Sequence, residues 1–302
     1  MLPLVFVLES HDFNLFGCCN LLISPLPPPR VLIIDDDPDI SSVLCAALEA
    51  VGCLVTAETQ SEKAEEACRS SHPELVLVDM MMPGRSGIEL LGPLHEIAPD
   101  AIICIMTGMG DPALLQRSLK SGAWNVLCKP YSLSDLAELI EMSLRLSASL
   151  REEAGAGFVS NESEWEYAGD HKPTSADLAR LIAVASESGN DPDLSFRKLP
   201  LLAQELLDNA VEHGTQGDTA KHYGSKLKSV PGALELTIWD DGSGFDGQTK
   251  IRQLSHAAPR GKLSGLQLAS ALADEIRFGK QPNSVTVIWR NKPIDNQGDT
   301  NS

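Results

Sequence analysis

The sequence lacks an excess of basic residues. Such an excess is typical of proteins that bind nucleic acid non-specifically and of proteins that dock on anionic membranes. The sequence has 24 Lys and Arg residues against 42 Asp and Glu residues, which gives a formal net charge of −18. A surface of that sign repels phosphate groups. We therefore expect neither nucleic acid nor a membrane among its partners.

Cysteine spacing typical of a zinc site or of a disulfide framework is also missing. All seven cysteines precede residue 130, their number is odd, and no Cys-x-x-Cys pair occurs. Cys104 and Cys128 lie inside apolar runs, where cysteine packs as a small hydrophobic residue. These features predict a protein of a reducing, cytoplasmic compartment.

The N-terminal segment lacks the basic start of a signal peptide, and Glu9 and Asp12 interrupt its apolar stretch before it could span a bilayer. The proline-rich PLPPP that follows favours extended chain. We predict that residues 1–29 form a disordered extension. The polar residues 292–302 predict a disordered tail.

The chain is long enough for two domains, since it has 302 residues. Of these residues 43% are hydrophobic, which is typical of globular proteins. From Arg30 onward, short apolar runs alternate with helical patterns, which is typical of a doubly wound α/β domain with a parallel sheet. We predict this domain at residues 30–150, with a helix over 39–51 among its five. Its five strands are VLIIDDD, CLVTAE, ELVLVD, AIICIMTG and WNVLC.

Residues 151–175 combine glycine, serine and charge without apolar periodicity, and we interpret them as a linker. The following residues, 176–291, mix helical patterns with strands in a different order. Two helices come first, then the strand GALELTIWDD, the helix SGLQLASALADEI and the strand SVTVIWR. This order predicts an α+β sandwich.

Polar side chains gather at the predicted strand ends of the first domain. Asp35 and Asp36 follow the first strand, Asp79 ends the third, Thr107 the fourth and Lys129 the fifth. The carboxyl ends of parallel strands meet at one edge of the sheet. Carboxylates there suit Mg²⁺ and can attack a phosphoryl group, while a hydroxyl and an ammonium can hold its oxygens.

This set of strand ends resembles the response-regulator receiver domain, a flavodoxin-like fold. The resemblance implies that Asp79 is the phosphoacceptor, with a sensor histidine kinase as partner. It also implies a cis Lys129–Pro130 bond and, as one alternative, a homodimer formed through the receiver. Val126 stands where receivers commonly carry a switching Tyr or Phe. The other implied roles are Mg²⁺ binding by Asp35, Asp36, Asp79 and the Met81 carbonyl, and phosphate sensing by Thr107 and Lys129.

The stretch QELLDNAVEHG predicts a helix with Glu205, Asp208, Asn209 and Glu212 on one face. Three acids and an amide on one stripe repel one another unless water or a cation lies among them. The Asn209 amide oxygen suits Mg²⁺ beside phosphate oxygens. Glu205, one turn earlier, can accept a proton from an attacking hydroxyl.

Downstream, Asp240-x-Gly242-x-Gly244 follows a predicted strand, and Gly265 opens a predicted helix. A strand-end aspartate can accept from an exocyclic amine, and glycines let backbone approach a flat ring. Helix N-terminal amides can receive phosphate. The helix over QELLDNAVEHG should end at its His213-Gly214 pair, because Gly often follows a helix and His⁺ suits a helix C-terminus.

In this order the motifs resemble the GHKL (Bergerat) ATPase fold, and within it the anti-sigma-factor serine-kinase type. The resemblance implies that Glu205 is the catalytic base. It also implies that ATP and Mg²⁺ are cofactors and that a protein of anti-anti-sigma or sigma-factor type is the partner. Leu263 replaces the first glycine of the last glycine box. The implied nucleotide-binding residues are Asn209 (also an Mg²⁺ ligand), Asp240, Gly242, Gly244, Gly265, Arg260 and Lys262.

Three functional alternatives follow. A histidine kinase needs an acceptor histidine on a helix before the ATPase, and the only histidine between residues 150 and 200 is His171, in a loop-like stretch. We therefore set that alternative aside. The remaining two are a response regulator whose ATPase domain phosphorylates a partner on Ser or Thr, and a non-catalytic, receiver-gated module that sequesters a sigma factor or its antagonist. Leu263 favours the latter, while Glu205, Asn209 and Asp240 favour the enzyme.

Overall fold

The computed structural model describes residues 28–152, 162–188, 190–244, 246–256, 259–280 and 283–290. Apart from residues 28 and 29, the predicted disordered ends lie outside these ranges. The chain divides into two compact units, Met1–Ser147 with Ala258–Leu263, and Ala148–Ala257 with Ser264–Ser302. Among the described helices, none has the length and apolar character needed to cross a membrane.

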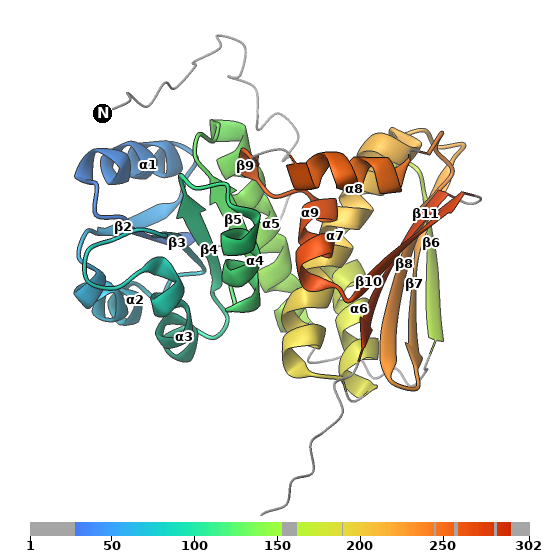
Figure 1. Cartoon of the computed structure of the whole chain (residues 1–302), viewed down its shortest axis with the longest axis horizontal. Helices are drawn as coiled ribbons and strands as arrows, with labels where there is room; N and C mark the ends of the chain where they lie inside the picture. The colour runs from blue at the N-terminus through green and yellow to red at the C-terminus, as the bar shows by residue number, and fades with distance from the viewer. Residues whose placement is uncertain are drawn as a thin grey trace, which may run out of the picture. The chain divides into compact units, whose positions relative to one another are not determined.

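The first unit contains the predicted parallel sheet, with helices on both of its faces (Figure 1). Its strand order is β2-β1-β3-β4-β5-β9, and the first five strands are parallel as predicted. A sixth, antiparallel strand, β9, was not predicted and pairs with β5. The strands are β1 Arg30–Ile34, β2 Leu54–Glu58, β3 Leu75–Asp79, β4 Ile102–Thr107, β5 Asn125–Cys128 and β9 Gly261–Lys262.

Continuous apolar runs form the central strands because helices cover both faces of the sheet. Every residue of β3, β4 and β5 is buried. Each fully buried Leu, Ile or Val side chain contributes about 2 kcal/mol to folding. The helices that provide this cover are α1 Pro38–Ala50, α2 Ala64–Ser71, α3 Gly87–Ile97, α4 Pro112–Lys120 and α5 Leu133–Glu152.

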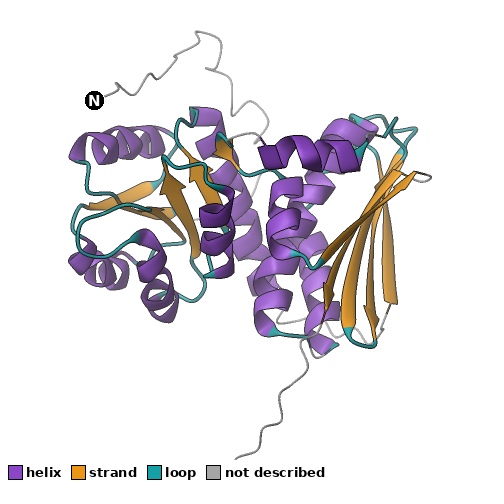
Figure 2. Cartoon of the chain, in the orientation of Figure 1, coloured by secondary structure: helices purple, strands orange, loops and turns teal. Residues whose placement is uncertain are grey.

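The second unit is the predicted sandwich of a sheet and helices. Its five strands are antiparallel in the order β10-β11-β8-β7-β6, and its helices cover one face of the sheet (Figure 2). The strands are β6 Glu162–Ala168, β7 His222–Val230, β8 Ala233–Asp240, β10 Glu275–Lys280 and β11 Asn283–Arg290. The helices are α6 Ser175–Glu187, α7 Leu199–Asn209, α8 Gly247–His256 and α9 Gly265–Leu272.

Part of the predicted linker is a strand. Residues 162–168 form β6, which pairs with β7 at the edge of the second sheet. Glutamates alternate with Ser163, Trp165 and Tyr167, and the glutamates are the exposed half of that alternation. Lys226 of β7 offsets their charge, since its Nζ lies 2.7 Å from Glu162 and 3.2 Å from Glu164.

The helix that carries Asn209 does not end at Gly214, so the prediction for His213-Gly214 was wrong. After α7 it continues as π-helix over Ala210–Thr215 and ends at Gln216, which takes the left-handed conformation with φ 58°. The Gln216 N–H donates to the Val211 carbonyl at 2.7 Å, the wide-turn pattern of a π-helix. Gly214 is therefore inside the helix, where it lies against the side chain of Asp240.

Asp177 stabilises the start of α6. It forms a capping box with Thr174, whose N–H donates to Asp177 Oδ2 at 2.9 Å, and His171 Nε2 lies 3.0 Å from the same oxygen. Burial alone raises the pKa of this carboxyl, but the hydrogen bonds from Thr174 and His171 outweigh it, so the pKa lies below the ordinary value. The ionised carboxylate therefore stabilises the folded state above about pH 4, and this stabilisation disappears as the pH falls through the lower folded pKa.

We expect Asp177→Asn to lower the free energy of unfolding by about 2 kcal/mol at pH 7, because a buried charged acceptor is lost. The difference from wild type should shrink as the pH falls below about 4. Urea unfolding at a series of pH values measures both effects. Asp170→Asn, an exposed position in the preceding turn, is the matched control and should change little. A deficit independent of pH would contradict the assignment.

Candidate functional sites

The register of the first sheet brings the predicted phosphorylation residues together. Asp79, the last residue of β3, lies opposite Met106 of β4, and Thr107 lies opposite Cys128 of β5. Lys129 follows Cys128 directly, so its side chain reaches the same edge of the sheet. The peptide bond between Lys129 and Pro130 is cis, as predicted.

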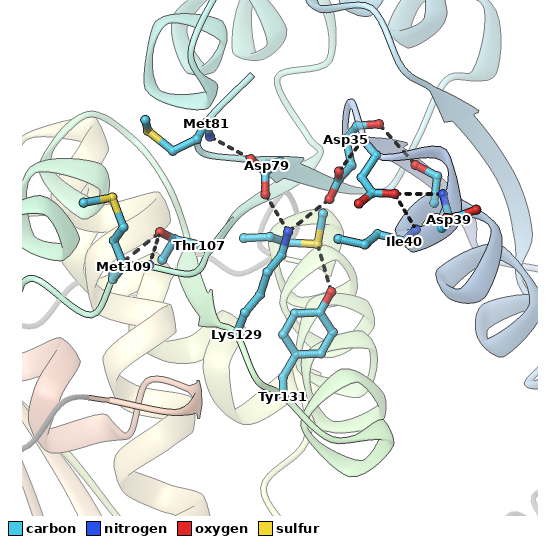
Figure 3. A network of polar contacts seen from close by, with 12 residues as sticks. Asp35, Asp39, Ile40, Asp79, Met81, Thr107, Met109, Lys129 and Tyr131 are labelled. Carbon is cyan, nitrogen blue, oxygen red and sulfur yellow. Dashed lines mark hydrogen bonds and ion pairs between the residues drawn. The ribbon is translucent and has the colours of Figure 1, made fainter. Parts of the chain in front are cut away.

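Lys129 joins two carboxylates (Figure 3). Its Nζ lies 2.7 Å from Asp79 Oδ1 and 3.2 Å from Asp35 Oδ2. The other oxygens accept backbone N–H groups, Asp79 Oδ2 from Met81 at 2.7 Å and Asp35 Oδ1 from Asp37 at 3.0 Å. Asp35 is 1% exposed and Asp79 is 7% exposed. Charge-assisted hydrogen bonds thus fix the orientation of the Asp79 carboxylate at the C-terminal end of β3.

Burial and charge set the protonation states around Lys129. Burial raises the pKa of Asp35 above its ordinary value and outweighs the hydrogen bond from Asp37 and the charge of Lys129. For Lys129 itself burial lowers the pKa, but the hydrogen bond to Asp79 and the charges of Asp79 and Asp35 prevail, so the pKa lies above its ordinary value. Lys129 is therefore a fixed cation at neutral pH.

The donor set at this edge fits Mg²⁺. Asp35 and Asp79 lie close enough to share one ammonium, and Asp36 beside them is exposed. Within the ranges that the structure describes, no three His, Cys, Asp or Glu side chains form a metal-binding group by themselves. Mg²⁺ keeps several waters and takes one or two carboxylates, which Asp35 and Asp79 can supply. Coordination by Asp36 and by the Met81 carbonyl stays a prediction.

Thr107 and Tyr131 complete this edge. The Thr107 hydroxyl accepts the Met109 N–H at 3.0 Å and is buried beside Asp79. The Tyr131 hydroxyl lies 3.6 Å from the Met106 sulfur (Figure 3), and burial raises its pKa to about 12. Tyr131 is therefore a neutral donor next to Lys129 at physiological pH.

In the second unit, the predicted base and the predicted Mg²⁺ ligand lie together on α7. Glu205 is 7% exposed and Asn209 is half-buried one turn later. Gly265, the first residue of α9, lies against both, since a Cβ there would be 3.1 Å from Asn209 Nδ2 and 3.1 Å from Glu205 Cβ. The amide oxygen of Asn209 fits Mg²⁺ beside phosphate oxygens, and a capping box of Ser264 and Gln267 starts α9 next to it.

Asp240 is enclosed by Gly214, which lies further along the same helix, and by Gly242 in the loop after β8. A Cβ on Gly214 would clash with the Asp240 carboxyl group, and a Cβ on Gly242 would lie 2.6 Å from Asp240 Oδ1. The Gly242 N–H donates to that oxygen at 2.8 Å. Gly214 is thus the link between the Asn209 helix and the predicted adenine reader, which explains why glycine stands inside the helix.

The predicted lid residues belong to the first unit, and their phosphate contacts stay a prediction. Lys262 belongs to β9 of the first unit, where its Nζ lies 3.7 Å from Glu138. Arg260 is exposed, and Leu263 is buried and belongs to the first unit as well. Two residues of the second site, Gly214 and Asn283, were missed by sequence reasoning. Gly214 gave a misleading signal as a helix end, and Asn283 gave none.

Two family models match the chain. The response regulator receiver domain matches residues 31–141, and the histidine kinase-like ATPase domain matches residues 171–289. The first match lies within the first unit, and the second covers most of the second unit together with residues 259–263 of the first.

Curated relatives match only part of this chain. The phosphoglycerate transport system transcriptional regulatory protein PgtA of Salmonella typhimurium is 36% identical over 40% of this chain and 29% of its own length. The response regulator protein PilR of Pseudomonas aeruginosa is 31% identical over 68% of this chain and 48% of its own length. The chain thus spans less than half of either relative.

A solved CheY-like receiver domain from Methanospirillum hungatei is 28% identical, with a TM-score of 0.38, over 42% of this chain and 99% of its own. Receiver domains are phosphorylated by sensor histidine kinases. Residues 31–141 of this chain belong to the response regulator receiver family and residues 171–289 to the histidine kinase-like ATPase family, so the protein is a receiver domain fused to a histidine kinase-like ATPase domain.

Proposed function

We propose that the chain is a cytoplasmic response regulator that a sensor histidine kinase phosphorylates on Asp79. The hydrogen bonds from Lys129 and Met81 aim the Asp79 carboxylate. One carboxylate oxygen attacks the phosphorus of a phosphohistidine, the P–N bond breaks, and an acyl phosphate forms. Lys129 and the Thr107 hydroxyl then hold the phosphoryl oxygens, and Asp35 and Asp36 would hold a Mg²⁺ ion that supplies further positive charge there.

The ATPase domain binds Mg·ATP and transfers its γ-phosphoryl group to a serine or threonine of a partner protein of the anti-anti-sigma type. The observation that carries this proposal is the buried Glu205 one turn before Asn209, with Gly265 against both. Asn209 would hold Mg²⁺ beside the phosphates. The substrate hydroxyl attacks the γ-phosphorus, Glu205 accepts its proton, and ADP leaves.

A contact inside the first unit supports control by phosphorylation. In β9, Gly261 lies opposite Cys128 of β5, the residue before Lys129. The Lys262 N–H donates to Asp135 Oδ1 at 3.4 Å, and Asp135 Oδ2 accepts the Ser132 N–H at 2.7 Å. A rearrangement of Lys129 on phosphorylation would therefore reach the segment that precedes α9.

The same contact favours the second candidate function, a non-catalytic module. Residues 259–263 lie inside the ATPase family match and yet belong to the first unit. A segment paired with β5 is not free to close over a nucleotide. In that case the ATPase fold sequesters a sigma factor or its antagonist, and the receiver gates that binding without phosphoryl transfer.

Calorimetry of Mg·ATP binding tests the proposal and separates the two candidates. Wild type should bind saturably, and Asn209→Ala should weaken binding by about 10- to 100-fold, because the Mg²⁺-bridging amide is lost. Each protein is titrated with and without beryllofluoride, which mimics the phosphoryl group on Asp79. Glu212→Gln, at an exposed position on the same helix, is the matched control. Absence of binding in wild type under both conditions would overturn the kinase and leave the sequestering module.

A further inference from the structure

The Asp240 carboxylate is held from a strand that the sequence motifs do not include. Asn283 begins β11 and lies directly opposite Asp240 in the antiparallel register. Its side-chain Nδ2 lies 3.0 Å from Asp240 Oδ1 and 3.1 Å from Oδ2, so one amide group spans both oxygens. The Gly242 N–H adds a third contact, to Oδ1.

The residues packed around Asp240 hold its carboxylate group in one orientation. Gly214 and Gly242 close on the carboxylate from the helix and from the loop after β8. Gly244, at φ 74°, brings the same loop against the Asn283 amide, where a Cβ would lie 3.1 Å from its Oδ1. In the described part of the chain, no Lys, Arg or His pairs with Asp240, so neutral N–H groups alone balance this half-buried charge.

The hydrogen-bond count shows which oxygen is left for a ligand. Oδ1 accepts from both Gly242 and Asn283, whereas Oδ2 accepts only from Asn283. A carboxylate oxygen accommodates two donors. Oδ2 therefore keeps a lone pair, whose direction is fixed because Asn283 prevents the carboxyl group from turning about its otherwise broad χ2 torsion.

We infer that Asn283 is a positioning residue that aims Asp240 Oδ2 at the 6-amino group of a purine and so sets a preference for adenine nucleotides over 6-oxopurine nucleotides. The inference rests on the proposed nucleotide binding. An adenine amine donates to Oδ2, whereas the oxygen of a 6-oxopurine meets the carboxylate acceptor to acceptor, which is repulsive. Without Asn283, only the Gly242 N–H holds the carboxylate, which then turns more easily and distinguishes the two rings less well.

The test compares Mg·ATP with Mg·ITP, which carries oxygen instead of the amino group, by calorimetry on the full chain. Wild type should prefer ATP. Asn283→Ala should weaken ATP binding about tenfold, the loss of roughly one hydrogen bond to a charged group, and leave ITP binding nearly unchanged. The ratio of the two affinities should therefore approach one. Asn283→Asp, nearly the same size but without the donor, should flatten the ratio as well, which separates the hydrogen bond from packing.

Ser284→Ala, the next position on β11, is the matched control and should keep the wild-type ratio. If the Asn283 variants weaken ATP and ITP binding equally, or keep the wild-type ratio, the inference is wrong while the nucleotide site stands. A wild type that binds both nucleotides equally well overturns it too. A wild type that binds neither nucleotide overturns the proposed function, and this inference with it.

Discussion

Asp79→Asn should abolish phosphorylation of the chain by acetyl phosphate and by a cognate sensor kinase. The asparagine amide has the shape of the carboxylate and keeps one acceptor oxygen, for either the Lys129 ammonium or the Met81 N–H, so the fold should persist. It lacks the anionic oxygen that attacks phosphorus, and no acyl phosphate can form. Intact-mass spectrometry after incubation with Mg²⁺ and acetyl phosphate measures the added phosphoryl group, which hydroxylamine should remove from the wild type.

Asp37→Asn is the matched control for Asp79→Asn. Asp37 lies two residues beyond Asp35, but its exposed carboxylate caps α1 by accepting the Asp39 and Ile40 N–H groups. Asparagine caps a helix as well as aspartate does, so stability should change by at most about 0.5 kcal/mol. Phosphorylation should continue at the wild-type level. A phosphoryl group that still appears on Asp79→Asn would place the acceptor elsewhere in the chain.

The first fold could be predicted from sequence because its signals are local. Runs such as VLII and LVLV are apolar throughout and are followed directly by aspartate, which is typical of strands buried on both faces of a parallel sheet. The parallel order then brings Asp35, Asp79 and Lys129 to one edge without further information. The pairing of β9 with β5 could not be foreseen, since two residues of glycine and lysine carry no strand pattern.

The second fold was harder because an antiparallel sheet with one open face needs fewer apolar residues. β6 alternates glutamate with Ser163, Trp165 and Tyr167, and its charges concealed the period of two. β7 was missed for the same reason, since lysines at 226 and 228 interrupt its apolar positions. The helix predicted over 264–276 ends at Leu272 because residues 275–280 pair with β11 as β10.

The residues missed in the second site depend on tertiary contacts. Gly214 has the sequence signature of a helix end, but the structure uses its missing side chain to admit the Asp240 carboxylate. Asn283 matters only because the register of β11 places it opposite Asp240. Neither fact can be read from spacing along the chain, whereas Glu205 and Asn209 could be, because one helical turn fixes their proximity.

Glu205→Gln should lower phosphoryl transfer from Mg·ATP by about 10²- to 10⁴-fold, the usual contribution of a general base. Glutamine keeps the size of Glu205 but cannot take the proton of the attacking hydroxyl. Affinity for Mg·ATP should change by less than about threefold, because Asn209 and Asp240 remain in place. Transfer is measured with labelled ATP and a purified anti-anti-sigma-type protein, and binding is measured by calorimetry on the same samples.

The separation of binding from transfer is what identifies Glu205 as a base, and Glu212→Gln provides the comparison. Glu212 is exposed on the same helix two turns later, and its replacement changes the net charge of the chain by the same amount. Because its side chain is exposed, both the Mg·ATP affinity and the transfer rate should stay at wild-type levels. Glu205 is buried against α9 through Gly265, and a purely structural role would weaken binding and transfer together. Transfer at the wild-type rate in Glu205→Gln would remove the base from the mechanism and leave positioning and charge stabilisation as the only contributions of α7.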